Sequence, residues 1–337
     1  MKINFFNKKI IFFIFRYKFR KLAFNNFLKT KILNDYRLIV LSGPFFSWLG
    51  YLIYKFNLSD KFKFISCDGW PFLFNEKNSI NIWFGGTILK IPENLKKYKN
   101  NYVTASTLFT RTSDVIQFYP SNIKKRNNLQ DPKIVIALSS KTIDDPLVLK
   151  IWCENKEKIL ENLSLLENKN FWESIEINDL NFKRKQFIYI SIKSLLRIDL
   201  LKIIKKNFNH LCIFVGDDLK RYFTGVYSSD FNYGYLKKLY DGNICLDFLA
   251  KDGDQILYPR SIEILENGGT LFQIATNNSE KLFEHYKDNL TFNSSAEMIK
   301  KLENLISKKE LNKFNDFFIK KFNKSNYNQD TLKNILY

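Results

Sequence analysis

Short, continuously apolar segments recur along this chain, and polar stretches with helical spacing separate them. Between residues 36 and 140 the segments are YRLIVLSG, FKFISCDGW, INIWFGG, NYVTAS, DVIQFYPS and KIVIALSS. Strands of a parallel sheet read as continuous apolar runs because helices cover both faces of the sheet. The pattern therefore predicts a first α/β unit that ends with a strand at residues 133–140.

A second alternation of strands and helices begins after residue 183. Its predicted strands are QFIYISI, HLCIFVGDD, NICLDFLA and TLFQIA. Helices are expected from Arg197, over 235–240 and 260–267, and in a tail that carries Met298, Leu302 and Ile306 and then Leu311, Phe314 and Phe317 at helical spacing. Two such blocks predict an α/β chain of two Rossmann-like, doubly wound domains.

The length of 337 residues also favours two domains, because one hydrophobic core rarely organises so long a chain. We predict an N-terminal segment at 1–30, a first Rossmann-like domain at 31–140, a helical bridge at 141–182, and a second domain with a helical tail at 183–337. Ligands of open α/β sheets bind outside the carboxyl ends of the strands. The active site is therefore expected in the cleft between the two domains.

The charge of the chain is strongly positive, since 53 Lys and Arg against 34 Asp and Glu give a formal net charge of +19. Such a charge favours anionic partners, such as a membrane surface, nucleic acid or a nucleotide-linked substrate. The joint abundance of Lys, Asn, Ile and Phe also fits an AT-rich coding sequence, which adds lysine without any partner. Arginine is scarcer, so Arg197 and Arg260 are the more informative cations, because a guanidinium binds phosphate in a bidentate way.

The cysteines predict a reduced, cytoplasmic protein without a zinc site. Four cysteines lie far apart with no C-x-x-C pair, and only two histidines are present. The sequence also contains no G-x-G-x-x-G, no Walker loop and no Ser-His-Asp elbow. Disulfide scaffolds, zinc proteins and serine hydrolases are thereby disfavoured.

The N-terminal segment MKINFFNKKIIFFIFRYKFRK holds an apolar run, residues 10–15, between basic residues. The run is too short to span a bilayer and lacks the small-residue cleavage site of a signal peptide. Two interpretations stay open: a basic aromatic helix that lies on an anionic membrane face, or an ordinary first helix packed on the body.

The stretch LYPRSIEILENGGTLFQI carries the most specific local signals. Pro259 suits the first turn of a helix, and Gly268-Gly269 supplies a left-handed stop about two turns later. Arg260, Glu263 and Asn267 are spaced i, i+3 and i+7, so they share one face of this helix. A short helix that follows a buried strand directs its free N–H groups at the ligand crevice, where they favour an anion such as a diphosphate.

The longer segment ICLDFLAKDGDQILYPRSIEILENGGTLFQI resembles the donor-binding half of GT-B glycosyltransferases, particularly those with a spore-maturation-type (CgeB-like) C-terminal domain. In that family a Pro-Arg-x-x-Glu helix is followed by a small-residue turn and a strand. The resemblance covers roughly residues 185–320, where FIYISIKSLLRIDLLKII matches the family's opening strand and helix, and CIFVGDD its second strand. For residues 1–180 only the architecture is compatible.

The resemblance implies roles for the residues of the second domain. Glu263 would hold the ribose hydroxyls of the donor, and Arg260 would face the diphosphate and offset the charge that develops on the leaving group. Arg197 and Gly216 would approach the donor phosphates, and the pair Gly268-Gly269 belongs to the same donor site.

Four features leave alternatives open. Arg260 and Glu263 also fit a surface ion pair, and Arg197 fits a solvated helix position. Many retaining members of the superfamily carry a second glutamate eight positions before the first, whereas this chain has Gln255, so the stereochemistry stays open. Asp252-Gly253-Asp254 has the Asp-x-Asp form of metal-dependent GT-A enzymes, but it lies inside a second α/β unit, which favours a turn and no bound metal.

The first domain offers candidate residues for the acceptor. Gly43, Asp68 and the pair Gly85-Gly86 each follow a predicted strand and are expected to face the cleft. Asp68 is the candidate general base for an acceptor hydroxyl, because an inverting transfer needs a group that takes this proton. A turn or N-cap aspartate explains Asp68 as well.

The resemblance, together with these observations, implies a GT-B glycosyltransferase, of hexosyltransferase type, that transfers a sugar from a nucleotide-activated donor to a glycan or lipid-linked acceptor in surface polysaccharide synthesis. No metal or other cofactor is expected. The enzyme would be cytoplasmic, and peripheral at the inner membrane face if its acceptor is a lipid. The alternatives are a non-catalytic nucleotide-binding protein of the same architecture and a charge-driven nucleic-acid-binding protein. Against nucleic acid, the aromatic residues follow core periodicity and do not cluster with Lys and Arg.

Overall fold

The protein divides into two compact units, Met1–Ser121 with Ser325–Tyr337, and Asn122–Lys324. The structure is a computed structural model, and it describes five short strands before residue 104 and most of the chain from 119 to 327. The described ranges are 11–13, 38–42, 63–67, 79–83, 101–103, 119–120, 122–138, 142–175, 177, 180–227, 233–248, 257, 259–276, 279–307, 310–323, 325 and 327.

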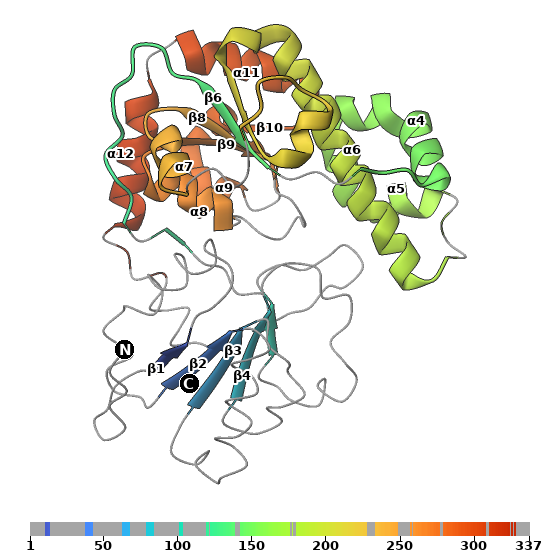
Figure 1. Ribbon diagram of the computed structural model, residues 1–337, viewed down its shortest axis with the longest axis horizontal. Coiled ribbons are helices and arrows are strands. Elements are labelled where there is room, and N and C mark those ends of the chain that lie inside the picture. Colours follow the sequence, from blue (N-terminus) through green and yellow to red (C-terminus); the bar gives the residue numbers. More distant parts are fainter. Residues whose placement is uncertain are drawn as a thin grey trace. The chain divides into compact units, whose positions relative to one another are not determined.

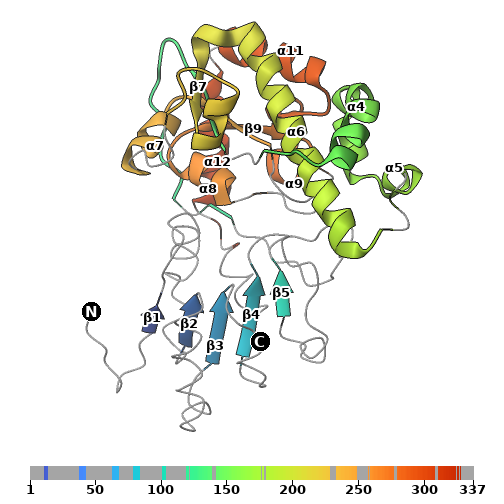
Figure 2. The same ribbon diagram turned by 45° about the vertical axis from the view of Figure 1, so that its right-hand side comes forward.

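The first unit contains a parallel sheet of five strands in the order β1-β2-β3-β4-β5. The strands are β1 (Ile11–Phe13), β2 (Leu38–Ser42), β3 (Lys63–Cys67), β4 (Ser79–Trp83) and β5 (Asn101–Val103), and Figure 2 shows them side by side. Strands β2 to β5 confirm the predictions from the apolar runs. The strand predicted in DVIQFYPS falls mainly on residues outside the described ranges. The order of the described strands follows the sequence without the reversal that a doubly wound sheet shows.

The N-terminal apolar run forms a strand, so both helical interpretations of it are wrong for residues 11–13. Strand β1 pairs in parallel with β2, with Ile11 opposite Ile39 and Phe13 opposite Leu41. Isoleucine and phenylalanine suit a pleated surface, and the edge of β2 offers backbone groups for hydrogen bonds. Residues 11–13 therefore belong to the sheet of the first unit.

The second unit holds another parallel sheet, in the order β10-β9-β8-β6-β7. Its strands are β6 (Ile134–Ala137), β7 (Cys212–Val215), β8 (Ile244–Asp247), β9 (Thr270–Ile274) and β10 (Thr291–Phe292). The strand predicted at 133–140 thus exists, but it opens the second sheet and does not close the first. The strand order reverses at β6, because β7 lies on one side of it and β8 on the other. Such a reversal is the usual ligand-binding position of an open α/β sheet.

The second unit begins earlier than predicted, because the segment before β6 belongs to it. The Arg126 guanidinium donates to the Asn312 side chain at 2.9 Å and to the carbonyl of Gly242, and the Arg126 amide donates to Asn315 Oδ1 at 3.0 Å. Asn312 and Asn315 belong to α12 (Leu311–Phe322). These bonds tie the entry of the second unit to its last helix, so the boundary falls near residue 122 instead of residue 140.

The segment QFIYISI is not a strand but part of α6 (Phe182–Phe208), a helix of 27 residues. Its buried side chains recur every four residues along the whole helix, at Ile188, Ile192, Leu196, Leu200 and Ile204. A window of seven residues cannot distinguish this stripe from a buried strand, whereas a longer window shows the helical period. At 1.5 Å per residue the helix is about 40 Å long, much longer than any strand of the sheet.

Residues 141–182 are helical as predicted, but they do not bridge the two units. They form α4 (Pro146–Glu161), η4 (Leu163–Glu167) and α5 (Lys169–Ser174), which lie between β6 and β7 of the same sheet. Together with the first half of α6 they make a helical extension beside the sheet (Figures 1 and 2). The Trp152 indole donates to Asp199 of α6 at 3.1 Å, and Trp172 packs edge-on against Tyr189.

The remaining elements cover the second sheet. They are η5 (Asn209–Leu211), η6 (Asp217–Arg221), α7 (Tyr233–Tyr240), α8 (Pro259–Glu266), α9 (Ser279–Phe283), η7 (Glu284–Tyr286), α10 (Lys287–Leu290), α11 (Ser295–Ser307) and α12. The predicted tail helices are confirmed as α11 and α12, which bury Met298, Leu302 and Phe314. Within the described ranges, no helix combines the length and the apolar character that a membrane crossing requires.

Candidate functional site

Strands β6 and β8 part before they end. Their pairing covers only Ile134 with Ile244 and Val135 with Cys245, whereas β6 pairs with β7 through Ala137. The last residues of the two strands, Ala137 and Asp247, therefore lie at an opening between neighbouring strands. This opening coincides with the reversal of strand order, where open α/β sheets bind ligands.

The first turn of α8 spans the parted strand ends. The Arg260 guanidinium donates through Nη1 to the carbonyl of Ala137, at the end of β6. The Ser261 hydroxyl donates to Oδ2 of Asp247, at the end of β8, over 2.5 Å. Because Ser261 and Asp247 are both buried, this bond is shielded from water. The two contacts fix the positive end of the α8 dipole at the opening.

Glu263 lies one turn further along α8 and is only 3% exposed. Of the three residues predicted to share one face of α8, Asn267 has a structural role. Its side-chain amide donates to the carbonyl of Glu263 at 2.7 Å and so closes the end of the helix. Arg260 and Glu263 remain as the charged groups of this face. Glu263 is buried and Arg260 is half-buried, so the two do not form the exposed surface ion pair that was the alternative.

A buried tyrosine completes the group. Tyr240 ends α7, which packs against α8, and its side chain is 1% exposed. Burial raises the pKa of Tyr240; Arg260 acts in the opposite direction, whereas Glu263 and Asp247 raise it further. The hydroxyl therefore keeps its proton and lies near the charged groups of α8 and β8.

The first glycine predicted for this site, Gly216, follows β7 and lies at the same edge of the sheet as the opening. Its φ of +143° lies outside the range that other residues adopt readily, and an added Cβ would lie 2.0 Å from the carbonyl oxygen of Leu138. The Gly216 amide donates to Tyr227 at 3.0 Å, and the Leu138 amide donates to Val215 at 3.0 Å. The Leu138 bond continues the pairing of β6 with β7 to the ends of both strands, whereas the Gly216 bond joins β7 to Tyr227. The opening therefore lies on the β8 side of β6.

The pair Gly268-Gly269 has a structural role. Gly268, with φ +79°, ends α8 in the left-handed conformation, as predicted. A Cβ on Gly269 would lie 2.8 Å from Ile264 and 3.0 Å from the Cys245 sulfur. The pair leads into the amino end of β9, at the edge of the sheet opposite to the opening, so its assignment to the donor site is not supported.

Arg197 is not at the start of a helix, contrary to the prediction. It lies in the middle of α6 and is half-buried there. The N–H groups near it are bonded within the helix, so this position offers no anion site of the helix-terminus kind.

The acceptor-side candidates Gly43, Asp68, Gly85 and Gly86 lie outside the described residues. Gly43 and Asp68 directly follow β2 and β3 in the sequence, and the last residues of those strands, Ser42 and Cys67, are register partners. The chain therefore leaves these neighbouring strands at one level. Asp252, Asp254 and Gln255 also lie outside the described ranges, so the Asp-x-Asp alternative stays a prediction.

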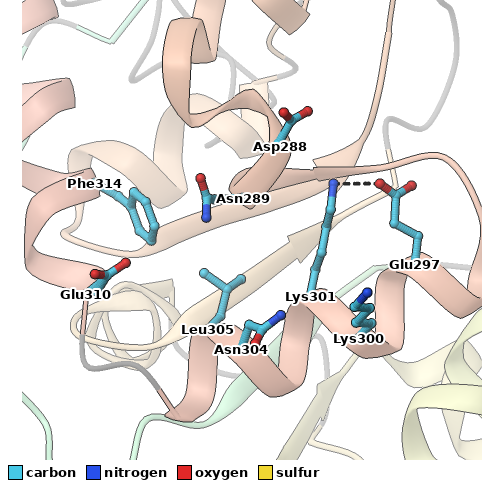
Figure 3. A pocket seen from close by; sticks show the side chains of 9 residues that line it. All are labelled: Asp288, Asn289, Glu297, Lys300, Lys301, Asn304, Leu305, Glu310 and Phe314. Carbon is cyan, nitrogen blue, oxygen red and sulfur yellow. Dashed lines mark ion pairs between the residues drawn. The ribbon is translucent and has the colours of Figure 1, made fainter.

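In the described part of the chain, no group of three or more His, Cys, Asp or Glu side chains is arranged to hold a metal ion. A separate cavity of about 250 Å³ lies between α10, α11 and α12 (Figure 3). Its wall carries both signs of charge, and the Lys301 ammonium is already bound by Glu297 at 2.6 Å and by the carbonyl of Thr291 at 2.7 Å. This cavity borders the amino end of β10, away from the opening at β6 and β8.

Sequence reasoning missed Tyr240, Asp247 and Ser261. Asp247 was visible as the acidic last residue of an otherwise apolar strand, ICLD. Ser261 and Tyr240 gave no such signal, because a serine in a first helical turn and a tyrosine at a helix end are both ordinary. Comparisons with protein-family models, curated proteins and solved structures found no match to this chain.

Proposed function

We propose that the protein is a glycosyltransferase of GT-B architecture that transfers a sugar from a nucleotide-activated donor to a glycan or lipid-linked acceptor. In this proposal the second unit binds the donor, and the first unit supplies the acceptor side. The observation that carries the proposal is the placement of Arg260 and Glu263 on α8, whose first turn is fixed at the parted ends of β6 and β8.

The chemistry of the opening suits a nucleoside diphosphate. The N–H groups and dipole at the start of α8 favour negative charge, and the guanidinium of Arg260 adds a full positive charge next to the end of β6. These groups would stabilise the charge on the diphosphate as the sugar leaves it. The buried carboxylate of Glu263 would accept hydrogen bonds from a vicinal hydroxyl pair, such as that of ribose.

The acceptor side of the proposal rests on the strand ends of the first unit. Asp68 is the candidate base that takes the proton of the acceptor hydroxyl. A lipid-linked acceptor would place the enzyme at the cytoplasmic face of a membrane, where its positive charge favours anionic lipids. No metal ion is needed in this scheme, because the helix terminus and Arg260 take the leaving group.

Calorimetric titration of the full chain with uridine, guanosine, thymidine and cytidine diphosphates tests the proposal. We expect one of them to bind, and Glu263→Gln to weaken it by about 1–3 kcal/mol because a charge-assisted acceptor is lost. Glu303→Gln is the matched control, since Glu303 is exposed on α11. Thermal unfolding of both variants shows whether the fold is intact.

The outcomes separate the possible functions. If no nucleoside diphosphate or sugar conjugate binds to wild-type protein, the proposal fails. Binding without sugar release or transfer to any acceptor would favour a non-catalytic nucleotide-binding protein of the same architecture. If Glu263→Gln and Glu303→Gln weaken nucleotide binding equally, the donor site does not include Glu263 on α8.

A further inference from the structure

The hydroxyl of Tyr240 has no hydrogen-bond partner among the residues that the structure describes, although its side chain is only 1% exposed. Buried hydroxyl groups are nearly always bonded, because an unbonded one has lost its hydrogen bonds to water without any replacement. Phenylalanine suits a purely apolar position better than tyrosine, since it fills nearly the same volume without a polar atom. The phenol oxygen of Tyr240 therefore points to a binding role for this residue.

The surroundings of this hydroxyl define the group that it can meet. Arg260 and the two carboxylates of Glu263 and Asp247 are its charged neighbours, and all belong to the elements that border the opening between β6 and β8. Tyr240 ends α7, which packs against α8, so its ring lies beside the helix that carries Arg260 and Glu263.

A ligand group at this position must satisfy donors and acceptors together. A phosphate oxygen would accept from Arg260 and Tyr240 but would meet repulsion from Glu263 and Asp247. An alcohol hydroxyl is both donor and acceptor, so it donates to a carboxylate and accepts from the phenol at once. The mixture of groups therefore favours a hydroxyl of a sugar over a phosphate.

We propose that Tyr240 is a ligand-binding residue, whose hydroxyl donates a hydrogen bond to a ribose hydroxyl of the nucleotide that Glu263 also holds. This inference rests on the proposed function and extends it, because it adds a specificity-determining residue and assigns the part of the ligand that it contacts. The site then distinguishes ribonucleotides from deoxynucleotides through two residues on different helices, α7 and α8.

The test combines Tyr240→Phe with nucleotides that lack one hydroxyl. Calorimetry on the full chain compares the best-binding nucleoside diphosphate with its 2′-deoxy and 3′-deoxy forms, in wild type and in the variant. We expect Tyr240→Phe to weaken the ribonucleotide roughly 3- to 10-fold, the effect of one lost hydrogen bond. At least one deoxy form should bind equally to both proteins, because the partner of the phenol is then already missing.

Stability provides an independent readout. Removing a buried, unbonded hydroxyl should leave the melting temperature of the free protein unchanged or raise it, so weaker binding would not reflect a damaged fold. Tyr286→Phe is the matched control, since this ring packs against Phe314 and Phe317 in another part of the unit.

Three results would overturn the inference. Unchanged ribonucleotide binding in Tyr240→Phe shows that the hydroxyl does not contact the ligand. Equal weakening of the ribonucleotide and both deoxy forms shows that it acts elsewhere than on the ribose. If wild-type protein binds no nucleoside diphosphate at all, the proposed function fails together with this inference, whereas the first two results leave the proposed function standing.

Discussion

The Ser261 hydroxyl and the Asp247 carboxylate form a 2.5 Å hydrogen bond that joins the first turn of α8 to the last residue of β8. Both side chains are buried, and the two residues lie fourteen positions apart in the sequence. With the contact between Arg260 and Ala137, this bond holds α8 across the opening between β6 and β8. The position of the candidate site therefore depends on two bonds made by adjacent residues.

Ser261→Ala should destabilise the second unit by about 1–3 kcal/mol, because the buried Asp247 carboxylate loses a donor. Urea unfolding followed by circular dichroism measures the change. Ser307→Ala is the control, since Ser307 is exposed and its substitution should stay within about 0.5 kcal/mol of wild type. Similar small effects for both variants would show that the bond contributes little.

Gly216→Ala should be much more damaging than Gly225→Ala. An alanine Cβ at Gly216 would lie 2.0 Å from the Leu138 carbonyl, whereas at Gly225, with φ +71°, no atom lies within 4 Å. We expect a loss of roughly 3 kcal/mol or more at Gly216, from overpacking and backbone strain, and about 1–2 kcal/mol at Gly225, from strain alone. Thermal unfolding of both variants checks the order, and a reversed order would contradict the described end of β7.

Thiol labelling should distinguish the cysteines by burial. Cys153 is exposed, whereas Cys245 is buried and burial raises its pKa well above the ordinary value. Iodoacetamide reacts with the thiolate, so Cys153 should be alkylated in the folded protein and Cys245 only after unfolding. Peptide mass spectrometry over time reads each site. Equal rates for the two cysteines in native buffer would be the contrary result.

Alkaline pH should destabilise the second unit through Cys212. Burial raises the pKa of Cys212 from 9.0 to about 11, so the folded state retains a proton that the unfolded state releases above pH 9. The free energy of unfolding therefore keeps the part that depends on the Cys212 proton below pH 9, and this part is lost as the pH rises from 9 through 11. Melting temperatures across this range should fall more steeply for wild type than for Cys212→Ala. Parallel curves would show that this thiol is not linked to folding.

Chelation should leave nucleotide binding intact. In the proposed function, the start of α8 and Arg260 would supply the positive charge that a divalent cation provides in other enzymes, so EDTA should change neither the affinity for the nucleoside diphosphate nor sugar transfer. The measurement is the same titration with and without EDTA. A loss that manganese restores would instead support Asp252 and Asp254 as metal ligands.

Local signals were sufficient where a single residue type fixes the backbone. Pro259 begins α8 and Gly268 ends it with φ +79°, and both positions follow from the conformational limits of proline and glycine. Strands β7, β8 and β9 were likewise predictable, because short runs of buried apolar residues stand between polar segments. Arg260 and Glu263 could be chosen as candidate site residues from their spacing on that one helix together with the family resemblance, and their roles remain predictions.

Tertiary structure decided the assignments that depend on distant partners. An apolar run does not specify which strand it pairs with, so the sequence could not show that β1 joins β2 or that β6 joins β7 and β8. The same limit explains α6, whose buried stripe is visible only along its full length. Tyr240, Asp247 and Ser261 come together only because α7, β8 and α8 pack on one another, and such proximity arises from the folded chain and not from residue spacing.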